Sequence, residues 1–226
     1  MPRIDPAKLQ KRILSAVVMA SVSVYAIVQG GIFLLALVVL CAVFCLYEWI
    51  HLALKTRHRL LFMAAGVVYI VLCFYCCYLI RAQFSPHTAV LFVLMIWASD
   101  VAAYFAGKFI GGARMSREIS PNKTWAGYIA AFAAPGLLGA GNAVLYTGIE
   151  IHALNLFLTF LAGALIGVVG QSGDLLISWY KRHAHVKDSS ALIPGHGGML
   201  DRVDALMLAA PVFLFMATTF PHVFNP

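Results

Sequence analysis

Polar side chains with catalytic potential are concentrated in residues 171–204, which hold four of the nine carboxylates, four of the sixteen Lys and Arg, and three of the eight His. Apolar segments long enough to cross a bilayer flank this stretch on both sides, where ionisable residues are costly unless they bind something. Asp174, Ser178 and Lys181 are spaced so that they share one face of a helix. This face fits either a ligand site or an aspartate beside a lysine that extends to the membrane surface.

Asp201 and Asp204 lie three residues apart at the start of the last apolar segment. Carboxylates at a helix N-terminus are favoured by the helix dipole, which is their simplest structural explanation. The same spacing suits a divalent cation shared with a phosphate, because Mg²⁺ takes one or two carboxylates together with substrate oxygens. With Asp174, these acids predict a site for one or two metal ions beside a basic loop.

Two loop segments could bind phosphate. Gly197 and Gly198 follow His196 in a glycine-rich turn, where backbone N–H groups and the imidazole could face an anion. Ser120, followed by proline, is typical of a helix N-cap before the first helical residue. That helix start and Lys123 would then face a phosphate, although a cap beside a cytoplasmic lysine explains the same residues.

Two further acids lie in other apolar segments. Asp100 sits well inside its segment and therefore needs a partner or a polar cavity. Glu48, next to Trp49, is interpreted as an interfacial residue. We therefore expect Asp100, but not Glu48, to join Lys123 and the acids of the polar stretch in one site.

The composition is that of a membrane protein: 62% of the residues are hydrophobic, 11% are charged and the mean hydropathy is +0.88. We predict an all-α, polytopic transmembrane helical bundle, a single domain of residues 1–226 with N-terminal spans in 1–90 and catalytic spans and loops in 91–226. The expected spans, about seven, lie at 13–29, 31–53, 60–80, 88–108, 125–146, 154–178 and 203–221. The first two are separated only by residues 29–31, so they could instead form one kinked element.

The charges in the loops predict the topology. With these spans, fifteen of the sixteen Lys and Arg fall on one side of the membrane and only Arg81 on the other. By the positive-inside rule the basic side is cytoplasmic, which places the N-terminus inside. The net charge of +7 suits anionic lipid headgroups and phosphates. The sequence shows no soluble basic domain and no aromatic stacking surface, so nucleic acid is a poorer candidate for the partner.

The polar stretch also matches a known pattern. It begins with SWYKR at residues 178–182, continues with Lys187-Asp188 and ends with PGHGGMLDRVD at residues 194–204. This long, gapped pattern resembles the signature of the phosphatidate cytidylyltransferases (CDP-diacylglycerol synthases), and SPNKT at residues 120–124 is similar to that family too. Tyr180 is a mild departure, since the family usually has an aliphatic residue or Phe there.

The resemblance implies transfer of a cytidylyl group from CTP to phosphatidic acid, giving CDP-diacylglycerol and pyrophosphate, with Mg²⁺ as cofactor and a second metal ion left open. It also implies a multi-pass protein of a bacterial inner membrane, with its active site on the cytoplasmic face and CTP, phosphatidic acid and membrane lipids as partners. The metal ligands it implies are Asp174, Asp201 and Asp204. The catalytic residues are Lys181, Arg202 and Asp204. The substrate-binding residues are Ser178, Lys123, Ser120, His196, Gly197, Gly198 and Lys187.

Two other functions and one assembly question stay open at this point. A related CTP-dependent transferase could act on a polyprenyl or other lipid acceptor. An ion-coupled transporter could use Asp100 and Asp174 as an ion path, but a transporter is expected to place ionisable residues near the midplane in paired repeats. The sequence leaves open whether the protein forms a homodimer.

Overall fold

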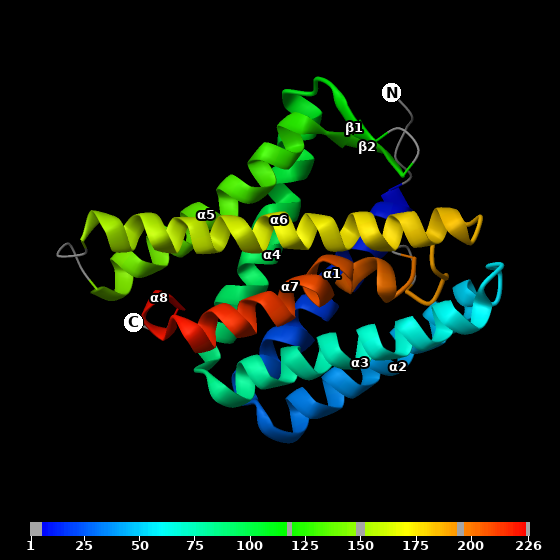
Figure 1. Cartoon of the computed structure of the whole chain (residues 1–226), viewed down its shortest axis with the longest axis horizontal. Helices are drawn as coiled ribbons and strands as arrows, with labels where there is room; N and C mark the ends of the chain where they lie inside the picture. Colours follow the sequence, from blue (N-terminus) through cyan, green and yellow to red (C-terminus); the bar gives the residue numbers. More distant parts are fainter. Residues whose placement is uncertain (1–5, 117–118, 148–151, 194–196, 225–226) are drawn as a thin grey trace.

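The computed structural model describes residues 6–116, 119–147, 152–193 and 197–224 of the chain (Figure 1). The elements in chain order are α1 (Pro6–Gln29), α2 (Gly31–Ala53), α3 (Arg59–Gln83), α4 (Pro86–Phe109), β1 (Arg114–Ser116), β2 (Ser120–Thr124), α5 (Trp125–Thr147), α6 (Ala153–His183), α7 (Leu200–Thr219) and α8 (Pro221–Phe224). Each predicted span coincides with one of the helices α1 to α7. The predicted all-α helical bundle is therefore confirmed.

Within the described part of the chain, five helices are long and apolar enough to cross a membrane: α2, α3, α4, α5 as far as Leu145, and α6. The apolar part of α1, Ile13–Gln29, is shorter, and α7 begins with Leu-Asp-Arg-Val-Asp. The polytopic character of the chain is thus confirmed by the central helices. Crossing by α1 and α7, and the cytoplasmic N-terminus, stay predictions.

α1 and α2 are separate helices, which decides against one kinked element. Gly30 and Gly31 have φ values of 68° and 50°, a left-handed conformation that glycine adopts without a Cβ penalty. Arg81 of α3 donates from Nε to the Ile27 carbonyl at 2.7 Å and from Nη2 to the Val28 carbonyl at 3.3 Å. The cation therefore satisfies carbonyls that the end of α1 leaves without a helical partner.

α6 packs between α5 and α7 and runs across the molecule along its longest dimension (Figure 1). Its glycines permit this close packing. A Cβ on Gly163 would lie 2.2 Å from the Pro135 carbonyl oxygen of α5, and one on Gly173 would lie 2.5 Å from the Asp204 carbonyl oxygen of α7. Small residues let helix backbones approach closely in membranes. The result is that the polar ends of α6 and α7 lie side by side.

The prediction that Ser120 caps a helix is wrong. Residues Ser120–Thr124 form β2, which pairs with β1 in an antiparallel hairpin, with Arg114 opposite Thr124 and Ser116 opposite Ser120. The pairing satisfies backbone groups that a helix would otherwise have used. The helix begins at Trp125 instead, and the Thr124 hydroxyl accepts a hydrogen bond from the Gly127 N–H at 3.1 Å. Thr124 is thus the residue in the N-cap role.

A stack of aromatic rings joins α2, α3 and α6. The Trp49 and Tyr180 ring centroids are 4.2 Å apart, and the Phe62 and Tyr180 centroids are 5.2 Å apart. The Tyr180 hydroxyl donates to the Trp49 carbonyl at 3.2 Å, and Trp49 Nε1 donates to the Phe62 carbonyl at 2.7 Å. A Cβ on Gly66 would lie 1.8 Å from Trp49 Nε1, so only glycine fits there. The unusual Tyr180 therefore has a buried hydrogen-bond partner.

Candidate active site

A polar cavity of about 430 Å³ lies where the ends of α4, α6 and α7 meet β2 and the start of α5. The residues that line it are Asp100, Ala103, Tyr104, Met115, Asn122, Lys123, Thr124, Gly127, Tyr128, Gln171, Asp174, Lys181, Asp188, Asp201, Arg202 and Asp204. Four separate parts of the sequence thus contribute acids and cations to one space. A concave site lined by both acids and cations is a candidate binding site for a polar ligand.

Lys123 connects β2 to α6 and, through it, to α4. Its Nζ forms an ion pair with Asp174 Oδ2 at 2.8 Å and donates to Gln171 Oε1 at 2.9 Å. The amide nitrogen of Gln171 in turn donates to Asp100 Oδ1 at 3.0 Å. The expectation that Asp100 has a polar partner and shares a site with Lys123 is confirmed. Gln171 connects Lys123 to Asp100. A polar glutamine inside an apolar helix needs a partner, and this feature of the sequence could have identified it.

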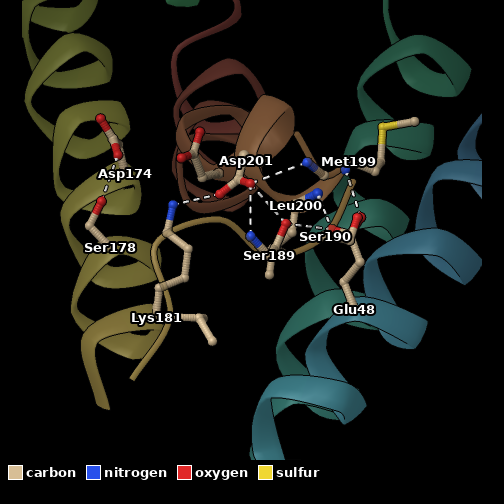
Figure 2. A network of polar contacts seen from close by, with 12 residues as sticks. Glu48, Asp174, Ser178, Lys181, Ser189, Ser190, Met199, Leu200 and Asp201 are labelled. Atoms are coloured by element: carbon tan, nitrogen blue, oxygen red, sulfur yellow. Dashed lines mark hydrogen bonds and ion pairs between the residues drawn. The ribbon is translucent and has the colours of Figure 1, made fainter. Parts of the chain in front are cut away.

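The face of α6 predicted from the spacing is present. The Ser178 hydroxyl donates to Asp174 Oδ1 at 3.1 Å, and Lys181, one further turn along, pairs with Asp201 Oδ1 at 2.5 Å (Figure 2). The side chains of Lys181 and Asp201 are 11% and 9% exposed, so this ion pair is shielded from water. It joins the end of α6 to the start of α7.

The second oxygen of Asp201 is held by the preceding loop. Asp201 Oδ2 accepts hydrogen bonds from the backbone N–H of Ser189 at 3.0 Å, from the Ser189 hydroxyl at 2.9 Å and from the Gly198 N–H at 3.2 Å (Figure 2). Burial raises the pKa of Asp201, but the hydrogen bonds from Lys181 and Ser189 outweigh this effect, and its pKa lies below the ordinary value. Asp201 is therefore a carboxylate at neutral pH.

Glu48 belongs to the same polar network, and the interpretation as an interfacial residue is wrong. It is 0% exposed, and its carboxylate accepts hydrogen bonds from Ser189, Ser190, Met199 and Leu200 (Figure 2). The carboxylate is buried against the loop before α7 and does not face the membrane interface. An acid that close to the end of an apolar helix could have been identified as one that needs partners.

The glycines of the loop surround the protein's own carboxylates. Gly197 has φ 82° and lies beside Asp201, and the Gly198 N–H donates to that same carboxylate. A Cβ on Gly198 would lie 2.6 Å from both Glu48 oxygens and 1.9 Å from the Ser189 hydroxyl. Close packing around Asp201 and Glu48 thus explains both glycines. Phosphate binding by them stays a prediction.

The remaining predicted residues are placed as follows. Arg202 and Asp204 line the cavity with Lys181, while Ser120 and Lys187 are not among the residues that line it. Ser178 is buried and reaches the site through Asp174. His196 lies outside the described residues.

Oxygen ligands suited to a divalent cation are present at the cavity. Asp174 is an electrostatic neighbour of both Asp100 and Asp204, and mutual repulsion of such acids is relieved by a bound cation. One oxygen of Asp204 accepts from the Ala205 N–H at 2.9 Å. Within the described residues, no group of three or more His, Cys, Asp or Glu is already gathered as a metal site. The donor chemistry fits Mg²⁺, which takes few protein ligands and completes its shell with substrate oxygens.

The fold and the cavity define a polytopic helical membrane protein with a charged site at the ends of its helices. A family model described as the cytidylyltransferase family matches residues 53–220. A phosphatidate cytidylyltransferase of Rickettsia typhi is 33% identical over 212 residues, which cover 92% of each chain. One of Rickettsia bellii is 31% identical over 93% of this chain and 91% of that protein, and one of Brucella suis is 41% identical over 61% of this chain and 49% of that protein. The chain belongs to the cytidylyltransferase family.

Proposed function

We propose that this protein transfers the cytidylyl group of CTP to phosphatidic acid, which gives CDP-diacylglycerol and pyrophosphate. The observation that supports this most directly is the cavity in which Lys123, Lys181 and Arg202 face a set of aspartates at the ends of apolar helices. In this proposal the nucleotide enters the cavity from water and the lipid phosphate enters it from the bilayer. The curated relatives carry the name of this activity.

In the proposed reaction, an oxygen of the lipid phosphate attacks the α-phosphorus of CTP. The bond from that phosphorus to the bridging oxygen of the β-phosphate breaks, and pyrophosphate leaves with the electron pair. A phosphate monoester is anionic near neutral pH, so no strong base is required. The protein's part is positioning and charge neutralisation. Lys123 and Lys181 are proposed to neutralise phosphate charge. Their ion pairs with Asp174 and Asp201 hold both ammonium groups at the cavity.

Mg²⁺ is proposed as the cofactor, held by carboxylates of Asp174 and Asp201, with Asp204 completing the site. When bound, the ion neutralises phosphate charge and helps the pyrophosphate to leave. Asp201 already accepts from Lys181, Ser189 and Gly198, so of the three predicted ligands it is the one most engaged with protein donors. The site is proposed to face the cytoplasm of a bacterial inner membrane, where CTP is present.

The proposal is tested with the purified full-length protein in detergent, labelled CTP, phosphatidic acid and Mg²⁺. We expect lipid-linked CMP and pyrophosphate in equal amounts, and none after chelation of the metal. Asp201→Asn is expected to abolish turnover while the protein still inserts and elutes as the wild type does. Labelled product with a polyprenyl phosphate but none with phosphatidic acid would show that the acceptor is a polyprenyl phosphate and would contradict the proposal.

A further inference from the structure

Glu48 places a buried carboxylate of α2 against the loop that precedes α7. Each of its oxygens accepts one hydroxyl and one backbone donor. Oε1 accepts from the Ser190 hydroxyl at 2.5 Å and the Met199 N–H at 2.9 Å. Oε2 accepts from the Ser189 hydroxyl at 2.9 Å and the Leu200 N–H at 2.8 Å. A fully buried charge surrounded by four donor groups, one of which is the Ser189 hydroxyl that it shares with Asp201, is held in one geometry, because any lost donor would leave it under-solvated.

Two of these donors belong to the first residues of α7. Met199 is the N-cap residue, its own side chain makes no capping hydrogen bond, and Leu200 is the first helical residue. The N–H groups at a helix start have no partner within the helix, and an anion there is also favoured by the helix dipole. Glu48 therefore caps α7 from a different helix. Asp201 is the next residue in α7, so the cap fixes the start of the helix that presents Asp201.

Ser189 connects Glu48 to Asp201 directly. Its hydroxyl lies 2.9 Å from a carboxylate oxygen of each residue, and its N–H donates to Asp201. Asp201 in turn holds the ammonium group of Lys181, which lines the cavity. A chain of contacts thus leads from α2 through the loop to a cation at the candidate active site.

We propose that Glu48 is a positioning residue for catalysis: through Ser189 and the start of α7 it sets the places of Asp201 and Lys181 in the cavity. The inference rests on the proposed function, since the cavity is taken as the site of cytidylyl transfer. It extends the machinery to Glu48 of α2, a residue that lies before the matched region of residues 53–220. The close fit of Gly198 against Glu48 and Ser189 supports it independently, because it leaves the loop no space to shift towards α2.

The test compares Glu48→Gln with the wild type as purified full-length proteins. The amide keeps the size of the side chain but turns one oxygen into a donor that faces two other donors. We expect kcat to fall by about 10- to 100-fold, as for small displacements of catalytic groups. KM for CTP should change by less than about threefold, because the loss concerns groups that act in the transition state. Hydrogen–deuterium exchange should rise in residues 189–193 and 197–200 and stay unchanged in α5.

Two serine variants provide a matched pair if Glu48→Gln folds poorly. Ser189→Ala removes a hydroxyl that touches both Glu48 and Asp201, whereas Ser190→Ala removes one that touches Glu48. We expect kcat of Ser189→Ala to be at least about fivefold below that of Ser190→Ala, the equivalent of one hydrogen bond. Wild-type kcat in both variants would show that these contacts of Glu48 do not position the reacting groups and would overturn the proposal.

The outcomes also separate this inference from the proposed function. A wild-type protein that makes no CDP-diacylglycerol contradicts the proposed function, and the exchange measurement then still tests whether Glu48 holds the loop and Asp201. An active wild type with a Glu48→Gln variant of unchanged kcat and unchanged exchange overturns the positioning role only.

Discussion

At the scale of single residues, the site depends on ion pairs that are placed before any substrate binds. Lys123 is held by Asp174 and Gln171, and Lys181 by Asp201. Preorganised charges stabilise a transition state without having to reorganise during the reaction. Each cation comes from a different element, so its position depends on the fold and not on neighbours in the sequence.

Lys123→Gln is expected to lower kcat/KM for CTP by about 10²- to 10³-fold, the range seen when one preorganised charge or donor is removed from a transition state. The substitution removes a charge from the cavity and leaves Asp174 without its cation. Lys55→Gln, at an exposed position between α2 and α3, is the control for a general change of charge. Steady-state kinetics on both proteins check the prediction, and near wild-type turnover of Lys123→Gln would contradict it.

Tyr180→Phe is expected to reduce stability by about 1 kcal/mol, the contribution of a typical hydrogen bond, and to keep most of the activity. Phe preserves the stack on Trp49 and Phe62 and loses only the bond to the Trp49 carbonyl. The measurement is the midpoint of thermal unfolding in detergent together with kcat. A loss of activity without a loss of stability would mean that the hydroxyl has a role in the reaction.

At the scale of elements, α6 organises the site because its glycines let α5 and α7 each pack closely against α6. One end of this contact places Gly163 on the backbone of Pro135, and the other places Gly173 on the backbone of Asp204. The contact at Gly173 brings Asp204 of α7 close to Asp174 of α6. A side chain on either glycine would therefore move elements that carry the site.

Gly163→Ala is expected to destabilise the protein by about 1–3 kcal/mol or more, as in overpacked cores, because its Cβ would lie 2.2 Å from the Pro135 carbonyl oxygen. Gly141→Ala in α5 is the matched control, since nothing lies within 4 Å of its Cβ position. Alanine at that helical position should be neutral or stabilising by up to about 1 kcal/mol. Thermal unfolding of the two variants in the same detergent makes the comparison, and equal midpoints would rule out close packing as the reason for Gly163.

At the scale of the whole molecule, the topology predicted from the charges is open to a direct test. Lys55 and Gln83 are both exposed. Lys55 lies just before α3, and Gln83 is the last residue of that helix. In a background without the native cysteines, Lys55→Cys should react with an impermeant thiol reagent only from the cytoplasmic side, and Gln83→Cys only from the outer side. Reaction of both from one side would contradict the predicted orientation.

The helices could be predicted from the sequence because hydrophobic length is a strong signal in a membrane protein. The spacing of Asp174, Ser178 and Lys181 likewise gave a correct helical face, since that periodicity is local. The β-hairpin at Ser120 was missed because a serine before a proline is equally compatible with a cap and a strand edge. Gln171 and Glu48 were not assigned to the site, because the partners of Gln171 lie 48 or more residues away in the chain and those of Glu48 lie 141 or more residues away.

The length of α6 has a consequence for where the chemistry takes place. A helix of 31 residues measures about 46 Å, whereas the hydrocarbon layer is about 30 Å thick. Counted from Ala153, an upright helix leaves the hydrocarbon after about twenty residues, which is at Asp174. The ten residues from Asp174 to His183 measure about 15 Å and then extend through the headgroup layer into the water. α6 thus sets the depth of the reaction: a lipid phosphate can meet the nucleotide while its acyl chains stay in the leaflet.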